Sequence, residues 1–374
     1  MDREALRMVC SREFWRMAVL WTVSLLYSYI LLFFLRRGAP VPRRRPMPEP
    51  DDDAARRRRP VCVITGATSG LGKAAAAALA REGFHVVLAG RSSQLLSETV
   101  QEIRDQQPDA HLEAFQVDLS SYKSIKKFET SLNQWIKDSN MEHSIQLLVN
   151  NAGILAKSYR ITEDGLDEMI QANYIGPFVL TNILLPLLKN SSTPSRVVNL
   201  TSFTHRCVSE INLSEKGLSG VRFGHWPARR SYLLASTYEY TKFCLLMFSY
   251  ELHRQLHLSS GVSVIETIHA PRAADPGVVQ TGIMRELPPC LSWLALSVLR
   301  LLNLLQQPDA GVDAVLDAAL APPEASGKYF FGGKGRTIRS SQLSYDVEVA
   351  KKLWAESLAL FNELQNRVCV LRTS

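Results

Sequence analysis

Closely spaced cysteine pairs are absent from this sequence of 374 residues, although it contains six cysteines. Zinc sites and disulfide-rich domains use short, repeated cysteine spacings, and the scattered positions here show none of them. The pattern therefore predicts ordinary thiols in a reducing compartment and no bound metal. The six are Cys10, Cys62, Cys207, Cys244, Cys290 and Cys369.

Outside one short stretch, the chain has little excess of either charge. The formal net charge is +7, and residues 36–59 alone hold nine arginines against four acids. Such a cluster is typical of a basic segment beside a membrane rather than of a basic groove, so nucleic acid is not an expected partner. With 46% hydrophobic and 21% charged residues, the composition also excludes wholesale disorder.

Charge is also missing from the nineteen residues Met17–Leu35. At ~1.5 Å per residue, a helix of this length spans most of a ~30 Å hydrocarbon core. The run therefore predicts a single-pass anchor, with a cleaved signal peptide as the alternative. The denser arginines after the run place the larger C-terminal part in the cytosol. Aromatic residues are candidates for interfacial anchors, namely Trp15, Trp21 and Tyr29.

No repeat or second change of composition follows residue 60, which predicts that the rest of the chain forms one domain. Strands alternating with helices predict an α/β fold with a doubly wound parallel sheet. The expected organisation is a flank at 1–16, an anchor at 17–35, a Pro- and Arg-rich linker at 36–59, the domain at 60–340 and a C-terminal helix and tail at 341–374.

The expected elements are short apolar runs and longer amphipathic segments. The strands are expected at Val61–Thr65, Phe84–Ala89, His111–Val117, Ile145–Val149, Arg196–Thr201, Val262–Thr267 and Lys328–Phe331. The helices are expected at Leu71–Arg81, Ser92–Gln106, Tyr122–Ile136, Leu166–Lys189 and Ala235–His257.

A glycine-rich segment stands where the first expected strand turns into the first helix. Glycines permit a tight turn and let backbone N–H groups approach a pyrophosphate at the positive helix N-terminus. The setting favours a dinucleotide-binding loop over a glycine-rich turn without a ligand. The loop residues expected to bind the cofactor are Gly66, Thr68, Ser69, Gly70, Leu71 and Gly72.

The end of the second strand decides between the two nicotinamide cofactors. An acidic residue there would bind the ribose 2′-hydroxyl of NAD, whereas an arginine accommodates the 2′-phosphate of NADP. The sequence has Arg91 at this point and Lys73 after the glycine loop. This pair predicts NADP(H), with solvated charges at helix ends as the alternative interpretation.

Five motifs in order make the chain resemble the short-chain dehydrogenase/reductase family over about residues 60–340. They are the glycine loop, Asn150–Gly153, Asn173 in Asn-Tyr-Ile-Gly-Pro-Phe, Ser202 after Val-Val-Asn-Leu-Thr, and Tyr238-Glu-Tyr-Thr-Lys242. The resemblance implies a Rossmann-type fold and the catalytic residues Asn173, Ser202, Tyr238 and Lys242. It also implies further cofactor-binding residues, namely Asp118, Leu119, Asn151, Ala152, Gly153, Tyr238, Lys242, Pro276, Gly277 and Thr281.

The spacing of Tyr238 and Lys242 supports these roles on physical grounds. Residues four apart share one face of a helix. An ammonium near a phenol favours phenolate and is expected to lower the Tyr238 pKa toward the range of an acid/base catalyst. Tyr240 is two residues from Lys242 and is expected to face elsewhere. Ser202 would bind the substrate oxygen, and by the resemblance Asn173 would hold a water that connects Lys242 to solvent.

Within the family, the chain is most similar to the membrane-anchored retinol-dehydrogenase branch. Ser202–His205 followed by Glu210–Leu213 is especially like a member that handles polyprenols. The resemblance implies carbonyl/alcohol interconversion on a lipophilic retinoid, polyprenol, sterol or similar substrate, at the endoplasmic reticulum, and leaves a homodimer open. NADP(H) favours reduction, although the sequence does not fix the direction. The alternative is a catalytically weak NADP(H)-binding sensor or membrane scaffold.

Three segments depart from the expected pattern. Between Ser202 and Tyr238 lies a long loop, which is either a solvated insertion or a site for an anionic group. Thr267–Ala274 is interpreted as an insertion before Pro276, which puts full activity in question. The apolar segment Leu287–Leu305 is either a lid that dips into a membrane or a core helix. The long loop carries Arg222, His225, Trp226, Arg229 and Arg230.

Overall fold

The computed structural model describes residues 8–35, 59–139, 141–211, 218, 233–258, 272–322 and 325–373. Within them, seven strands form one sheet in the order β3-β2-β1-β4-β5-β6-β9, and all its pairs are parallel. The doubly wound parallel sheet is thereby confirmed. The strands are β1 (Val61–Thr65), β2 (His85–Gly90), β3 (Leu112–Gln116), β4 (Leu147–Asn150), β5 (Arg196–Leu200), β6 (Arg272–Asp275) and β9 (Tyr329–Phe331).

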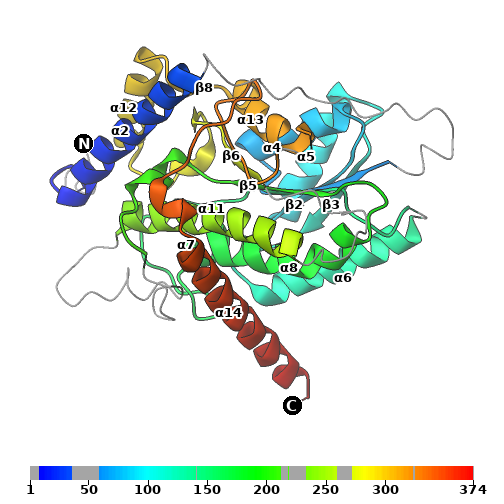
Figure 1. Cartoon of the computed structure of the whole chain (residues 1–374). Coiled ribbons are helices and arrows are strands. Elements are labelled where there is room, and N and C mark those ends of the chain that lie inside the picture. The colour runs from blue at the N-terminus through cyan, green and yellow to red at the C-terminus, as the bar shows by residue number, and fades with distance from the viewer. Residues whose placement is uncertain are drawn as a thin grey trace.

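Helices cover both faces of this sheet (Figure 1). One face carries α4 (Gly70–Arg81), α5 (Ser93–Gln106) and α13 (Pro308–Leu320), and the other carries α6 (Tyr122–Asp138), α8 (Gly176–Lys189) and α11 (Leu234–Leu258). Side chains alternate along each strand, so β1 sends Val61 and Val63 into one core and Cys62 and Ile64 into the other. Burial on both faces explains the continuous apolar runs in the sequence.

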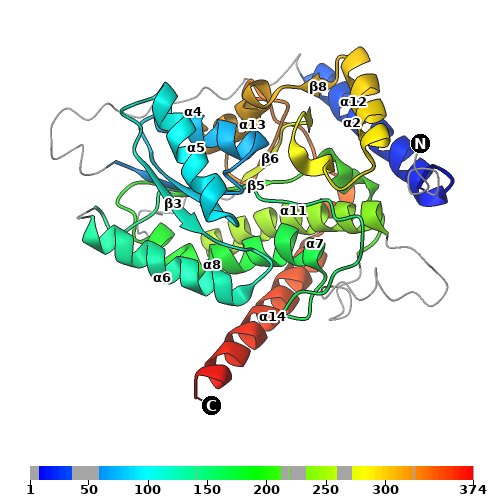
Figure 2. The same ribbon diagram turned by 180° about the vertical axis from the view of Figure 1, so that it is seen from behind.

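Shorter elements and one long helix complete the chain. These are α7 (Glu168–Ile170), the π-helix η1 (Gln171–Ile175), the 3-10 helices η2 (Phe203–Cys207), η3 (Gly282–Met284) and η5 (Gln342–Tyr345), β7 (Val278–Val279), β8 (Leu305–Gln306) and α12 (Pro289–Leu301). The C-terminal helix α14 (Val347–Thr373) packs on α11, where Trp354 stacks on Phe248 with ring centroids 5.9 Å apart. The far end of α14 projects from the domain, as both views show (Figures 1 and 2).

The sixth parallel strand is Arg272–Asp275, which corrects one expectation. Residues 272–274 were expected to belong to an inserted loop, but Ala273 lies opposite Asn199 of β5 in parallel register. Pro276 therefore follows the strand directly, and the insertion does not separate it from the sheet. The strand expected at 262–267 and the long loop's basic residues at 222–230 lie outside the described residues.

The N-terminal helix α2 (Arg12–Leu35) is apolar and a candidate for a membrane span. Its residues 12–34 have a mean hydropathy of 2.0, which is sufficient by length and composition to cross a membrane. In the structure α2 lies beside the catalytic domain, next to α12 at the same corner of the molecule (Figures 1 and 2). The interpretation of residues 287–305 as a core helix is wrong, because Trp293 of α12 is 70% exposed.

Candidate active site

The predicted site residues gather where β1, β4, β5 and β6 end at one edge of the sheet. In doubly wound sheets, ligands bind in the crevice outside the carboxyl ends of the strands. The glycine loop follows β1, Asn151–Gly153 follow β4, Ser202 follows β5 and Pro276 follows β6. Parallel strands thus bring together motifs that are more than 200 positions apart in the sequence.

Three glycines shape the loop between β1 and α4. Gly66 and Gly70 have positive φ angles of 67° and 50°, which side chains other than glycine rarely adopt. At Gly72, an added Cβ would lie 2.2 Å from the Gly66 carbonyl oxygen and 2.4 Å from Asn151 Nδ2. Helix α4 begins at Gly70 with Ser69 as its N-cap residue. The result is a close-packed turn in which the Ser69 side chain does not cap the first N–H groups of α4, and such groups bind a pyrophosphate.

Asn151 ties the ends of β1 and β4 together. Its Nδ2 donates to the carbonyl oxygens of Thr65 at 2.8 Å and Gly66 at 3.2 Å. The backbone N–H groups of Asn151 and Ala152 each donate to Thr65 Oγ1 at 3.1 Å. On the other side of the loop, a Cβ at Gly70 would lie 2.9 Å from Thr281 Cγ2. The glycines therefore let the loop pack closely on Ala152, Asn151 and Thr281, and they form the tight turn that a dinucleotide-binding loop requires.

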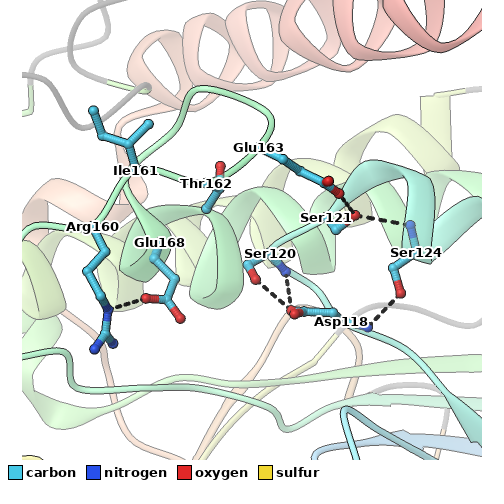
Figure 3. A pocket seen from close by; sticks show the side chains of 9 residues that line it. All are labelled: Asp118, Ser120, Ser121, Ser124, Arg160, Ile161, Thr162, Glu163 and Glu168. Carbon is cyan, nitrogen blue, oxygen red and sulfur yellow. Dashed lines mark hydrogen bonds and ion pairs between the residues drawn. The ribbon is translucent and has the colours of Figure 1, made fainter. Parts of the chain in front are cut away.

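A cavity of about 430 Å³ lies beside Asp118, one of the predicted cofactor-binding residues (Figure 3). Asp118 Oδ1 accepts hydrogen bonds from Ser120 N at 2.9 Å and Ser120 Oγ at 2.6 Å, which fixes the carboxylate at the cavity wall. Leu119 is buried next to it. The cavity is lined by Asp118, Ser120, Ser121, Ser124, Arg160, Ile161, Thr162, Glu163 and Glu168. Asp118 is the one lining residue that was predicted to bind the cofactor, and the four predicted catalytic residues are not among them.

The two basic residues expected near a 2′-phosphate both have acidic neighbours. Arg91 Nη1 lies 3.8 Å from Glu168 Oε1, and half of the Arg91 side chain is exposed. Lys73 forms an ion pair with Glu102. The side chains of Arg91 and Lys73, which are 50% and 34% exposed, both remain accessible to solvent.

Tyr238 and Ser202 are brought together at the end of β5. The Ser202 side chain lies near enough to the Tyr238 hydroxyl to favour its ionised form and to lower its pKa. Burial raises the pKa of Tyr238, and the negative charge of Asp275 raises it further. The lowered pKa expected from Lys242 is therefore not found in this structure. Tyr240 lies in the apolar core, as expected from its spacing.

Lys242 is buried under the same edge of the sheet. Its Nζ lies 5.7 Å from the centre of the Tyr238 ring and donates to the Leu200 carbonyl oxygen at 2.9 Å. Burial lowers the pKa of Lys242 to about 8, against an opposing attraction from Asp275. The ammonium therefore contacts a backbone carbonyl and lies over the face of the Tyr238 ring.

Asn173 lies within the π-helix η1, a local irregularity often found at functional sites. Its Oδ1 accepts from Ile154 N at 2.7 Å, and its Nδ2 donates to the Ile154 carbonyl at 2.9 Å. A Cβ at Gly153 would lie 3.4 Å from Lys242 Nζ and 3.5 Å from Asn173 Oδ1. Asn173 and Lys242 therefore lie on either side of Gly153. The Asn173 amide makes its hydrogen bonds to the Ile154 backbone and not to Lys242.

Asp275 is a site residue that the sequence reading missed. It is buried at the end of β6, where its carboxylate accepts from Tyr329 Oη at 2.5 Å and from Gly277 N at 2.8 Å. Burial raises the pKa of Asp275 to about 6, although the charges of Arg206 and Lys242 oppose this shift. The sequence does show a charged residue immediately before Pro276-Gly277. Its burial, however, depends on the neighbouring strand β9, which pairs with β6.

Helix α2 contributes Trp21, which was expected to anchor the helix at a membrane interface. The ring centroids of Trp21 and Tyr238 are 5.7 Å apart, so Trp21 faces Tyr238 rather than a membrane interface. Tyr29 likewise packs on Phe331 with centroids 5.3 Å apart. Around Tyr238 and Trp21 lies an apolar cluster of Met17, Ile154, Leu155, Ala156, Met169, Ala172, Leu234, Ile283 and Leu287.

Comparisons with known proteins agree with this fold and site. A model of the short chain dehydrogenase family matches residues 60–209. Human retinol dehydrogenase 13 is 32% identical over 80% of this chain and 83% of its own length. Human polyprenol dehydrogenase is 31% identical over 79% and 83%. The chain therefore belongs to the short-chain dehydrogenase/reductase family, in its retinol dehydrogenase-like branch.

Solved structures show the same fold. An uncharacterized protein from Mycobacterium paratuberculosis superposes with a TM-score of 0.60 at 27% identity, covering 82% of this chain and 94% of that protein. The angucycline C-6 ketoreductase LanV, solved with bound NADP, has a TM-score of 0.54 at 19% identity, covering 74% and 95%. Membership in the family establishes an oxidoreductase that uses a nicotinamide cofactor.

Gly72→Ala is expected to abolish cofactor binding. The added methyl group would clash with the Gly66 carbonyl oxygen at 2.2 Å and force the loop apart. Titration of the purified protein with NADPH, followed by its fluorescence, measures the loss. Gly282→Ala is the matched control, because no atom of the described residues lies within 4 Å of its added Cβ. Equal affinities for the two variants would contradict the assignment of the loop.

Asp275→Asn is expected to stabilise the protein more at pH 8 than at pH 5. The pKa of Asp275 is raised from 3.8 to about 6 on folding, so its contribution to stability is present below pH 4 and lost as the pH rises through 6. Removing the buried charge should then increase the free energy of unfolding by on the order of 2 kcal/mol at pH 8. Denaturant unfolding at both pH values measures the difference. An equal change in the free energy of unfolding at both pH values would show that folding does not raise the pKa of Asp275.

Proposed function

We propose that this protein is an NADP(H)-dependent oxidoreductase that interconverts a carbonyl and an alcohol on a lipophilic substrate. The observation that carries the proposal is the pairing of Tyr238 with Ser202 beneath an apolar cluster. The pair supplies two hydroxyls for one substrate oxygen, and the cluster supplies an apolar wall for the rest of the molecule. Sites of this composition bind mostly apolar ligands and orient them through few polar groups.

The reaction follows from the roles of the side chains. When bound, the nicotinamide supplies the hydride that reaches the carbonyl carbon, or accepts it in the reverse direction. Ser202 orients the carbonyl oxygen and stabilises its developing charge. Tyr238 carries the proton that this oxygen receives, and a raised pKa keeps the phenol protonated until then. Lys242, with a pKa near 8, can return a proton toward Tyr238 at neutral pH.

Selection of NADP(H) is assigned to Arg91 and Lys73. Strand β2 ends at Gly90, so Arg91 occupies the position where an acidic residue would bind the NAD ribose. The side chains of both basic residues remain partly exposed. A preference for NADPH would make reduction the favoured direction in a cell.

The substrate class is inferred from the apolar cluster and from the relatives. Retinol dehydrogenases and polyprenol dehydrogenases are named for lipid alcohols. Trp21 and Leu234 add large apolar surfaces beside Tyr238, which suit a hydrocarbon chain better than a sugar or a small acid. A lipid substrate also agrees with attachment to a membrane through α2, for which the endoplasmic reticulum with a cytosolic catalytic domain is proposed.

The alternative of a catalytically weak sensor rested on an insertion before Pro276. Because residues 272–274 form β6, that reason no longer applies. Catalytic activity is accordingly the stronger proposal.

Tyr238→Phe is expected to lower the rate of NADPH oxidation with a lipid aldehyde by about 10² to 10⁴-fold, because it removes the acid/base hydroxyl. Affinity for NADPH should be retained. Initial rates of the full-length enzyme with retinaldehyde or a polyprenal in detergent provide the measurement. Tyr240→Phe is the matched control, since Tyr240 lies on the same helix within the core. A Tyr238→Phe variant as active as the wild type would contradict the assignment of Tyr238 as the acid/base residue.

Arg91→Asp is expected to reverse the cofactor preference by at least about tenfold, because a carboxylate repels the 2′-phosphate and accepts the 2′-hydroxyl of NAD. The ratio of kcat/KM for NADPH and NADH measures the change. Arg81→Asp at the end of α4 serves as the control for added negative charge. An unchanged ratio in Arg91→Asp would assign cofactor selection to another residue.

A further inference from the structure

One face of α2 is buried against the catalytic domain along most of the helix. Leu25, Ser28 and Leu32 are 1%, 0% and 6% exposed. Their spacing of three and four places them on one face of a helix. Leu25 and Leu32 share an apolar cluster with Phe203 of η2 and Phe331 of β9. The helix is therefore packed on the domain as one of its layers.

Charged groups of the catalytic domain bind α2 at two levels along its length. Near the start of the helix, Arg16 Nη1 lies 3.1 Å from Glu239 Oε2, and Trp21 Nε1 donates to Glu239 Oε1 at 2.6 Å. Further along, Arg206 Nε donates to Ser28 Oγ at 3.1 Å. Glu239 is 2% exposed and follows the catalytic tyrosine directly in the chain.

These contacts cannot coexist with a helix that crosses a bilayer. The docked stretch Arg16–Leu32 is about 25 Å long at 1.5 Å per residue, which is most of the ~30 Å hydrocarbon core. A crossing helix would either lose these contacts or carry Glu239 and Arg206 into the hydrocarbon. Charged side chains are rare there, because each is costly to place near the bilayer centre.

The opposite face of α2 is apolar and exposed. Val19, Val23 and Ile30 are 56%, 57% and 51% exposed. Helix α12 lies alongside and exposes Trp293 and Leu294 at the same corner of the molecule (Figures 1 and 2). Arginines immediately follow α2 in the sequence, with nine between positions 36 and 59. An apolar surface next to a basic segment is complementary to the hydrocarbon and anionic headgroups of one lipid leaflet.

We propose that α2 lies along the surface of one leaflet while remaining docked on the catalytic domain, and that α12 enters the same leaflet beside it. Both ends of α2 are then on the side of the membrane that carries the active site. The inference rests on the proposed membrane attachment and is independent of the proposed reaction. Because Trp21 joins this helix to Tyr238, the active site opens next to the leaflet that holds the substrate.

A disulfide tests the docking in the membrane. Ser24 Oγ lies 3.3 Å from Cys207 Sγ, so Ser24→Cys places two thiols side by side. The full-length variant, with Cys10, Cys290 and Cys369 replaced by serine, is oxidised with copper phenanthroline in sealed microsomes. We expect a disulfide between the introduced thiol and Cys207, detected as a cross-linked peptide by mass spectrometry.

Val23→Cys in the same background is the matched control, because Val23 faces away from the domain and is 57% exposed. Cross-linking of Ser24→Cys should exceed that of Val23→Cys by at least about tenfold. Equal or absent cross-linking in membrane-bound protein would overturn the docking, since position 24 of a crossing helix lies deep in the bilayer, away from Cys207.

Cys10 tests whether both ends of α2 are on one side. It is exposed and precedes the helix, and Cys290 on α12 is an exposed reference in the catalytic domain. In sealed microsomes, a membrane-impermeant maleimide should label Cys10-only and Cys290-only proteins equally with and without detergent. Labelling of Cys10 only after detergent would mean a crossing helix and overturn the proposal. Recovery of the chain as a soluble dimer would assign the apolar face to a second copy and also overturn it, without bearing on the Tyr238→Phe result.

Discussion

The attachment of Lys242 to the end of β5 is the constraint on which the catalytic geometry depends. Its backbone carbonyl accepts from Thr201 Oγ1 at 2.8 Å, and its ammonium donates to the Leu200 carbonyl at 2.9 Å. These two bonds fix α11 against the sheet at one residue, so Tyr238, one turn earlier, comes beside Ser202. Burial of the ammonium lowers its pKa to about 8, which places a proton donor near neutrality under the catalytic phenol.

Ionisable side chains are buried close together around Lys242. Asp275 is buried beneath Tyr238 and Lys242, and its carboxylate is held by Tyr329 and the Gly277 N–H. Its negative charge raises the pKa values of both catalytic groups, so it favours the protonated phenol and the protonated amine. Asp275 thus changes the pKa values of Tyr238 and Lys242 through its negative charge, which is weakly screened in the low-dielectric interior.

The apolar helix α2 and the candidate active site are joined by direct contacts. Glu239, adjacent to Tyr238, binds Arg16 and Trp21 of the apolar helix α2. A change in the position of α2 would move Trp21 relative to Tyr238 and alter the apolar wall around the substrate. For a lipophilic substrate this arrangement shortens the path between its membrane and the reacting atoms, and it explains why an apolar helix retains buried polar contacts on one face.

Sequence patterns by themselves determined the parallel sheet, the glycine loop, the order of the site motifs and the family. Local rules suffice for these features, because apolar runs, glycine turns and an i,i+4 pair need few neighbours to specify them. Tertiary structure alone placed β6 at Arg272–Asp275, since this strand is defined by its pairing with β5 and β9. It also brought Asp275 and Trp21 to Tyr238 and docked α2 on the domain, because burial and electrostatic contacts depend on segments distant in the chain.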